Sequence, residues 1–520
     1  SSLASGNPGT GSGVYALGSA LDIDGDLNIY AGGIDVTGNA YNVNVAGGFT
    51  WNAGTFTAGT GTVILDGTAC DSAAQCSLLT TSTLNNINID NGLVGYWKLD
   101  DGTGSTIARD SSVNGNHGTL TNGPTWTDTP SYTSNFFNPG ALHFDGSDDY
   151  VATSAFSAPS NISLSLWAKS DTATWNDYGF LASKRSSFVV HPWNGNSTIR
   201  VYYYTPTEYY TNAVTVSDIT QWNIYTFTYD DSGLNFYVNG ALETTADYQG
   251  AINADSGGAM YIGKDDNFSR YFNGSIDDVR IYNRSLAASE VASLANGNPT
   301  TGSGVYSLGS ALNLTGNLGI YSGELRTGSG YGIALSGSWI NHGTFTSTGT
   351  VTLDGTSQSI SGNTVFNNLS VTRTAASTLT FDHKSRQSVS GALTLQGAAG
   401  QLLSLRSSLT GSAANLLLDS GIGSHNLSYL DVQDIDSSSG AQMIAFDTSS
   451  DSGNNTNWLF GSSITGTLYS DEGTTALASK NVSVSANGGA ISDTDDTDAG
   501  GMFTVSGVTL TGGTIVTLFI

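Results

Sequence analysis

The sequence contains few cysteines, prolines and cations, and very little glutamate. Its 520 residues include 2 Cys, 8 Pro and 16 Lys or Arg against 43 Asp or Glu, so the net charge is −27 at pH 7. Charged residues make up 11% of the chain, well below the roughly 25% of ordinary soluble domains. Such an acidic chain repels phosphate backbones, so we expect no nucleic-acid partner. No apolar run is long enough to cross a bilayer, so we expect no membrane insertion within this segment.

The scarcity of cysteine and the scatter of histidine exclude several kinds of site. Cys70 and Cys76 lie in one short polar loop, which allows a local disulfide in an oxidising compartment but no zinc site of the CxxC type. The six histidines are scattered, and HExxH, GxSxG and phosphate-binding-loop motifs are absent from the sequence. We therefore expect a protein without catalytic activity.

Gly, Ser, Thr and Asn supply the polarity that charged residues do not. In residues 1–91 and 293–460 they break the chain into short runs that alternate apolar and polar side chains, such as Thr62–Leu65 and Thr350–Leu353. No helical period is visible there. Many short, closely spaced strands predict a β-solenoid of the parallel β-helix type, and a β-sandwich is the alternative.

One passage of the chain occurs twice. Ser2–Pro8 matches Ser293–Pro299, and Leu65–Thr68 matches Leu353–Thr356. The two copies are separated by a segment of different texture, as expected of a protein built from repeats. Because Ser2–Pro8 resembles the end of that segment, we expect another such segment before residue 1 in a longer chain.

The separating segment, residues 92–292, is rich in aromatic residues. Ile162–Trp167 and Trp222–Tyr229 alternate at period two, as half-buried strands do. Leu234–Val238 runs into Asn239-Gly240, which predicts a hairpin. The pattern also predicts a single helix over Leu286–Leu294, started by Ser285 as its N-cap.

Four motifs of this segment resemble a known family. Gly92–Asp100, Asp110–Gly118, Leu142–Val151 and Gly274–Asn283 occur in the order found in laminin-G-like, concanavalin A-like jelly rolls of bacterial secreted proteins. The resemblance implies two packed antiparallel sheets without intrinsic catalysis. Glycosidases of the related fold use paired glutamates, whereas Glu208 and Glu243 stand alone.

The same resemblance implies a calcium ion near the edge of a sheet. Calcium takes six to eight oxygen ligands, which turns rich in Asp supply. Carried onto this sequence, the expected ligands are Asp110, Asp145, Asp148, Asp277 and Asp278. Turn capping is the alternative role for these side chains. A further acidic loop, Asp22–Asp26, corresponds to Asn313–Asn317 in the second copy, which favours a turn there.

Exposed aromatic rings beside polar groups would suit a carbohydrate, because ring faces stack on the apolar face of a sugar. The candidate residues are Trp175, Trp193, Tyr202, Tyr204 and Tyr209. In Val201–Tyr204, the side chains of Tyr202 and Tyr204 share one face of a strand, and Val201 and Tyr203 share the other. Packing in the core of the sandwich is the alternative.

Residues 461–520 have a third kind of sequence pattern. Ile464–Tyr469 and Thr514–Ile520 have the pattern of strands and resemble part of a small immunoglobulin-like or transthyretin-like module. The apolar run at Thr514–Ile520 indicates either a truncated module or a strand that pairs with another molecule.

Together these features predict a multidomain all-β protein: solenoid, concanavalin A-like jelly roll, longer solenoid and an immunoglobulin-like module. We expect a secreted or cell-surface adhesin, sheath or filament component with a calcium-stabilised jelly roll. Its expected partner is a glycan, a surface protein or copies of itself. The alternatives are a carbohydrate-binding module array of a larger secreted enzyme, and a self-assembling filament subunit with a donated C-terminal strand.

Overall fold

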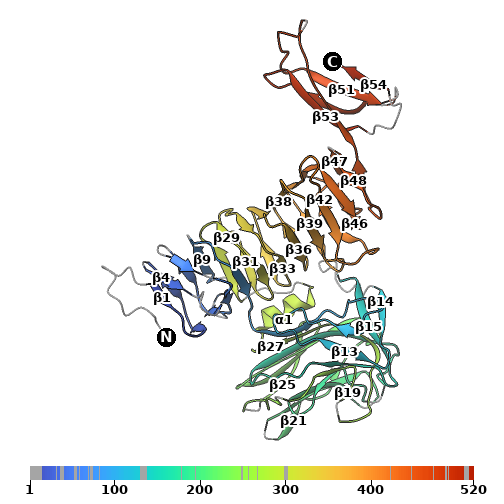
Figure 1. The fold of residues 1–520 in the computed structure, drawn as a ribbon. Helices are drawn as coiled ribbons and strands as arrows, with labels where there is room; N and C mark the ends of the chain where they lie inside the picture. Colours follow the sequence, from blue (N-terminus) through green and yellow to red (C-terminus); the bar gives the residue numbers. More distant parts are fainter. Residues whose placement is uncertain are drawn as a thin grey trace.

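The computed structural model is nearly all β, with one helix among the described residues (Figure 1). It describes residues 14–30, 32–35, 40–51, 55–57, 59–67, 70, 74–80, 82–128, 138–176, 178–193, 195–205, 207–247, 250–255, 257–265, 267–297, 303–421, 423–446, 448–471, 473–486, 489, 491–508 and 515–520. None of the helical residues in this part of the chain forms a helix long and apolar enough to span a bilayer.

Residues 14–90 and 305–460 form a stack of parallel strands, here called the parallel stack. The chain turns a corner after each strand, so that strands of three faces alternate along the sequence. The first face is a single 11-stranded sheet. Its strands, in spatial order, are β2 (Leu21–Ile23), β5 (Val43–Val45), β8 (Thr62–Leu65), β10 (Asn86–Ile89), β30 (Leu318–Ile320), β33 (Trp339–Asn341), β36 (Ser357–Ser361), β39 (Ser377–Phe381), β42 (Leu403–Ser407), β45 (Leu430–Gln433) and β48 (Ser450–Asp451).

The other two faces each consist of two sheets that follow one another along the stack. The second face contains β3 (Leu27–Ile29), β6 (Phe49–Trp51), β9 (Cys76–Thr80), β28 (Val305–Leu308), β31 (Glu324–Arg326) and β34 (Thr344–Thr346), then β37 (Thr364–Phe366), β40 (Arg386–Val389), β43 (Ala414–Leu418) and β46 (Ile435–Asp436). The third face contains β1 (Val14–Ala16), β4 (Gly33–Asp35) and β7 (Thr55–Thr57), then β29 (Leu312–Leu314), β32 (Ile333–Leu335), β35 (Thr350–Leu353), β38 (Asn368–Thr372), β41 (Ala392–Gln396), β44 (Ser424–Ser428), β47 (Met443–Phe446) and β49 (Trp458–Phe460).

The two sequence copies are continuous in space. Strand β10 of the first copy pairs in parallel with β30 of the second, which places Ile87 beside Leu318 and Ile89 beside Ile320. Strand β9 likewise pairs with β28, and one buried apolar cluster extends through both copies. The intervening segment is therefore inserted at one corner of the stack, between the first face and the second.

Equivalent strands of the two copies lie on different faces. Val14–Tyr15 matches Val305–Tyr306 in sequence, yet β1 belongs to the third face and β28 to the second. In the same way β2 lies on the first face, whereas its equivalent β29 lies on the third. The length of the repeat is thus not a whole number of coils. Because inward side chains on every face are apolar and alternate at period two, the same sequence suits any of the three faces.

Side chains at the corners bond one coil to the next. Asn86 Oδ1 accepts the backbone N–H of Asn317 at 2.8 Å, and Asn317 Oδ1 in turn accepts that of Ser338 at 2.7 Å. The same contact recurs at Asn368, whose Oδ1 accepts the N–H of Ala392 at 2.7 Å. At another corner, before β9, Cys70 and Cys76 form a disulfide.

The inserted segment contains two sheets in which all strand pairings are antiparallel. The eight-stranded sheet consists of β14 (Thr125–Asp128), β15 (Gly140–Asp145), β27 (Asn273–Tyr282), β17 (Ile162–Ser170), β23 (Asn223–Asp230), β24 (Gly233–Val238) and β25 (Ala241–Ala246), with β11 (Leu93–Trp97) beside β27. The nine-stranded sheet consists of β12 (Ile107–Ala108), β13 (Gly118–Thr121), β16 (Tyr150–Thr153), β26 (Tyr261–Ile262), β18 (Ala182–Lys184), β19 (Phe188–Trp193), β20 (Thr198–Tyr204) and β21 (Glu208–Tyr210), with β22 (Val214–Thr215) beside β20.

The two sheets enclose one apolar core. Leu164, Phe188 and Phe227 belong to this core. Helix α1 (Ala288–Ala295), which follows the last strand, docks this domain on the stack. The helix begins two residues later than predicted, with Ala287 rather than Ser285 as its N-cap, because Glu290 Oε2 accepts the N–H of Ala287 at 2.8 Å. Glu290 also forms an ion pair with Arg284 at 2.7 Å.

The points where the chain leaves and rejoins the stack are tied together. Ser303 Oγ donates to Glu290 Oε1 at 2.6 Å, and Asn91 Nδ2 donates to Ser303 Oγ at 2.5 Å. Nearby, the Tyr96 ring of the jelly roll meets the edge of His342 in the stack at 5.9 Å between centroids. The insertion therefore lies against the stack rather than on a free linker (Figure 1).

The C-terminal module adds two small sheets at the far end of the stack (Figure 1). Their strands are β50 (Ser462–Thr467) with β53 (Met502–Val508), and β52 (Ile491–Asp496), β51 (Asn481–Ala486) and β54 (Val516–Phe519). Strand β54 pairs with β51 of its own chain at the sheet edge, and the side chains of Ile515, Val516, Leu518, Phe519 and Ile520 are exposed. Of the predicted run Thr514–Ile520, Thr514 lies outside the described residues.

The continuity of the stack makes the insertion dispensable for its folding. Replacing residues 92–302 with a linker of about four Gly and Ser residues should leave a folded stack, because β9 and β10 pair directly with β28 and β30. Far-UV circular dichroism and a cooperative thermal transition would show this. An unfolded deletion variant would contradict it. As a control, Leu318→Asp in the deletion variant should abolish the transition, because it buries a charge between the copies.

Candidate functional site

A hollow of about 160 Å³ lies on the outer face of the nine-stranded sheet, where β19 and β21 lie far from the parallel stack (Figure 1). Most of its lining is aromatic or cationic, and we call it the aromatic pocket. It is lined by Tyr178, Phe180, Arg185, Val189, His191, Trp193, Tyr202, Tyr204, Glu208, Phe268 and Arg270.

Strand β20 contributes to the pocket by alternation. Val201 and Tyr203 are fully buried in the core, where Tyr203 stacks on Tyr209 with 5.6 Å between centroids. Tyr202 and Tyr204 point to the opposite face and line the pocket. The period of two assigned to these residues from the sequence is therefore the one observed.

The floor of the pocket is a row of stacked rings. His191 lies between Phe180 at 4.7 Å and Tyr202 at 4.8 Å, with interplanar angles of 26° and 25°. His191 is 4% exposed, and burial lowers its pKa to about 4. The imidazole is thus neutral near pH 7, and both of its faces are covered by neighbouring rings.

Three guanidinium groups surround this floor. Arg185 forms an ion pair with buried Asp265 and donates to the Tyr204 hydroxyl at 2.9 Å. Arg270 lies over the Tyr178 ring at 4.4 Å and the Phe268 ring at 4.7 Å. Arg200, just beside the pocket, lies over Trp193 at 3.9 Å. Stacking on these rings holds the guanidinium groups in place.

Of the five aromatic residues predicted to bind a carbohydrate, three line the pocket and two belong to the core or pack against it. Trp193, Tyr202 and Tyr204 meet in the pocket. Trp175 is buried in the core, and Tyr209 packs against that core through Tyr203.

Sequence reasoning missed several residues that line the pocket. Alternation along Phe188–Trp193 would have placed His191 beside Trp193, because Phe188 and Val190 face the core. Arg185, Phe268 and Arg270 come from connections outside the strands, so no periodicity marks them.

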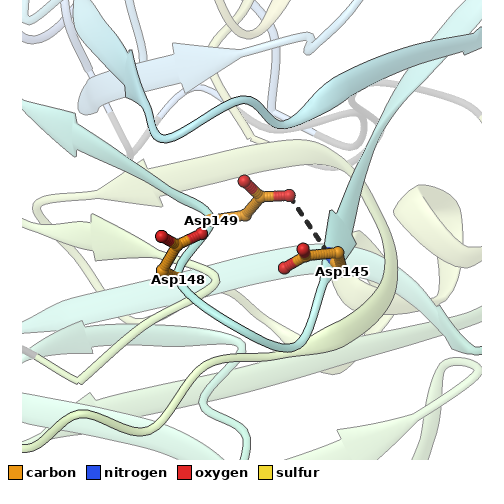
Figure 2. Close-up of side chains that lie close together, drawn as sticks. All are labelled: Asp145, Asp148 and Asp149. Carbon is orange, nitrogen blue, oxygen red and sulfur yellow. Dashed lines mark hydrogen bonds between the residues drawn. The ribbon is translucent and has the colours of Figure 1, made fainter.

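A separate acidic cluster lies in the turn between β15 and β16 (Figure 2). Carboxylate oxygens of Asp145, Asp148 and Asp149 lie within 4.8 Å of one another. Asp149 Oδ2 accepts the N–H of Asp145 at 3.1 Å, and Asp145 Oδ1 accepts that of Ser147 at 2.8 Å. Burial, and then the charges of Asp145 and Asp148, raise the pKa of Asp149. Three clustered carboxylates are a donor set that fits a hard divalent cation such as calcium.

The other predicted calcium ligands lie apart from this cluster. Asp110 accepts bonds from the N–H groups of Tyr96, Ser112 and Asn116 and from the Ser112 hydroxyl, at 2.7–2.8 Å. It therefore organises a turn.

Asp277 and Asp278 also bond within the protein. Asp277 accepts from Asn138 Nδ2 at 2.7 Å and from the N–H of Asp278 at 2.9 Å. Asp278 forms a buried ion pair with Arg280 at 3.1 Å. Asp149, which was not among the expected ligands, completes the cluster instead.

Part of the inserted segment matches a known family by sequence. Residues 145–292 match the sequence profile of the concanavalin A-like lectin/glucanases superfamily. No curated protein matches the chain.

Three solved structures are similar to part of this chain. Domain 4 of AbnA, a GH43 extracellular arabinanase of Geobacillus stearothermophilus solved with arabinotriose, is 20% identical, with 39% of this chain and 98% of that domain covered and a TM-score of 0.31. The binding domain of Paraclostridial Mosquitocidal Protein 1 is 15% identical (40% and 52% covered, TM-score 0.31). The botulinum neurotoxin serotype G binding domain is 16% identical (39% and 50% covered, TM-score 0.31). The match spans about half the length of the two toxin domains.

The buried imidazole should make the jelly roll less stable in mild acid. His191 has a pKa of about 4 in the folded state against an ordinary 6.5, so between these values the unfolded chain binds the extra proton. The free energy of unfolding should therefore fall by about 2 kcal/mol for this group between pH 7.5 and pH 5. Urea unfolding followed by tryptophan fluorescence would measure it. His191→Phe, which keeps a stacked ring, should show a correspondingly smaller loss, and equal losses would contradict the assignment.

Proposed function

We propose that this protein is a non-catalytic extracellular adhesive protein whose jelly roll binds a glycan in the aromatic pocket. The observation that carries the proposal is the pocket itself, where Trp193 and Tyr202 lie beside hydrogen-bonding groups of Tyr204, Glu208 and Arg270. Ring faces receive the C–H face of a sugar, and polar groups at the rim orient its hydroxyls. The exposed position of the pocket, away from the stack, leaves it open to a large ligand.

We propose further that the parallel stack is a β-solenoid that acts as a stiff support for this domain. Its buried cluster extends from Ile23 to Ala445, and side-chain bonds at the corners join neighbouring coils. Stacked coils give length without a second core. Arg284, which donates to the Asn91 carbonyl, and Glu290, which accepts from Ser303, would hold the jelly roll at one corner of the support.

Calcium is the proposed cofactor, held by Asp145, Asp148 and Asp149. The clustered carboxylates repel one another, and a divalent cation would remove that repulsion. Bound calcium would stiffen the turn between β15 and β16 at the edge of the jelly roll. The chemistry it supplies there is structural.

Self-association is a second candidate function, favoured by the exposed apolar residues of β54. Val516, Leu518 and Phe519 lie on an edge strand with side chains exposed to solvent. Edge strands of this kind pair with other chains unless they are covered. A second copy of the chain would be the partner.

Glycan binding is tested by removing the central ring of the pocket. Tyr202→Ala should weaken binding to an array-identified oligosaccharide about tenfold, because a lost stacking contact costs roughly 1.5 kcal/mol. Tyr331→Ala, which removes an exposed tyrosine of the stack, is the matched control and should bind normally. Failure of the protein to bind any glycan, or equal binding by both variants, would reject the pocket as the glycan site.

Calcium binding is tested by thermal unfolding with calcium and with chelator. A cation present at 100 times its dissociation constant stabilises the folded state by about 2.7 kcal/mol, so the melting temperature should rise by several degrees. The double substitution Asp145→Asn with Asp148→Asn should abolish the rise. Asp24→Asn, at an exposed acidic residue of the stack, should retain it. An unchanged melting curve of the unaltered protein would exclude a calcium site of this strength.

A further inference from the structure

Resting on the proposed glycan site, we propose that the aromatic pocket selects an anionic sugar, and that Arg270 binds its oxyanion. The site so far explains how a sugar ring is held but not which sugar. Arg270 distinguishes neutral from anionic sugars, because its guanidinium lies at the pocket and forms no ion pair with the carboxylates that the structure describes.

Arg185 is already neutralised by the protein. Its guanidinium contacts both carboxylate oxygens of Asp265, which is completely buried, and its remaining edge donates to the Tyr204 hydroxyl. A buried bidentate pair of this kind has little capacity left for a ligand. Arg185 therefore positions Tyr204 and does not contribute a free positive charge.

Arg270 is held by rings alone. Its guanidinium carbon lies 4.4 Å from the Tyr178 ring centre and 4.7 Å from that of Phe268. Within the described part of the chain, which excludes Asp266, no carboxylate forms an ion pair with Arg270 and no acceptor bonds to its side chain. The rings cover faces of the guanidinium and leave N–H groups at its edge, where a planar oxyanion can be bound by two parallel hydrogen bonds.

In so acidic a chain, leaving Arg270 without an acidic partner costs free energy unless a ligand supplies that partner. With a net charge of −27, a cation gains most by pairing with one of the many aspartates. Three other arginines of the jelly roll, Arg109, Arg280 and Arg284, form ion pairs with acidic residues. Arg270 therefore offers an oxyanion a local partner in a protein that repels anions elsewhere.

The remaining lining indicates a sugar rather than a free anion. Tyr202 and Trp193 contribute aromatic rings to the lining, and the Glu208 carboxylate can accept hydrogen bonds from hydroxyls, which phosphate or sulfate alone would not use. The volume of about 160 Å³ is below the roughly 300 Å³ of pockets for drug-sized ligands, so one sugar ring is enclosed. A carboxylate or a sulfate ester on that ring supplies the oxyanion.

The test is isothermal titration of the full chain with three tetrasaccharides: a neutral hexose oligomer, its sulfated form and a hexuronate oligomer. We expect at least one anionic form to bind about tenfold or more tightly than the neutral form, with an advantage that falls as salt rises. The stronger of the two identifies the oxyanion. Arg270→Gln should remove the advantage and leave neutral binding within about twofold.

Two further variants separate the effect of net charge from the effect of the planar guanidinium. Arg109→Gln changes the net charge of the same domain equally and should keep the advantage, since its side chain is exposed and paired with Asp101. Arg270→Lys should keep a small part of it, because lysine has charge without the planar fork. Equal circular dichroism spectra would show that all variants fold.

The outcomes distinguish this inference from the proposed function. If neutral and anionic sugars bind equally and Tyr202→Ala weakens both, the glycan site stands and the anionic selectivity is wrong. If Arg109→Gln reduces the advantage as much as Arg270→Gln, general charge rather than Arg270 is responsible, and the assignment is overturned. If the protein binds none of the sugars tested and no glycan of the array, the proposed function fails together with the inference.

Discussion

The whole molecule depends on the parallel pairing of each coil with the next, in a register that keeps apolar residues inside. Ile87 lies between Val63 of the preceding coil and Leu318 of the following one, and all three are buried. Parallel strands need crossover connections, and here the other faces of the coil provide them. A corner is outside this core, so one corner can carry about 200 residues of jelly roll without disturbing the pairing on either side. The bond of Asn91 to Ser303 shows that the two ends of the insertion lie close together at that corner.

The second constraint is the small number of cations in a very acidic chain. Most of the ion pairs serve the structure: Arg284 with Glu290 at the docking corner, Arg280 with Asp278 in the jelly roll, and Arg326 with Glu324 in the stack. Where the jelly roll meets the stack, burial lowers the pKa of His342 to about 3, so that His342 packs as a neutral ring beside Tyr96. Around the pocket on the nine-stranded sheet, Arg200 and Arg270 instead stack on aromatic rings. Acidic repulsion over the rest of the surface and local attraction at the pocket then act in the same direction on an anionic ligand.

Local patterns predicted much of the jelly roll and part of its site. Alternation placed Tyr202 and Tyr204 on one face, and both line the pocket. Proximity in sequence brought Asp145 and Asp148 together, since a short turn cannot separate them by much. Two residues assigned as calcium ligands by motif alone bond to the protein instead. Asp110 accepts hydrogen bonds from N–H groups around its own turn, and Asp277 accepts one from Asn138. Whether a carboxylate is available for a ligand depends on which donors the fold places around it, and those donors are distant in sequence.

The sequence by itself determined the all-β character, the internal repeat and the side of the strand to which Tyr202 and Tyr204 point. These follow from periodicity and turn residues, which act over a few residues. Only the tertiary structure decided that the two copies form one stack, that equivalent strands occupy different faces, and that Arg185, Phe268 and Arg270 meet around Tyr202. These arrangements depend on the number of strands per coil and on connections between strands, and neither leaves a periodic signal along the chain.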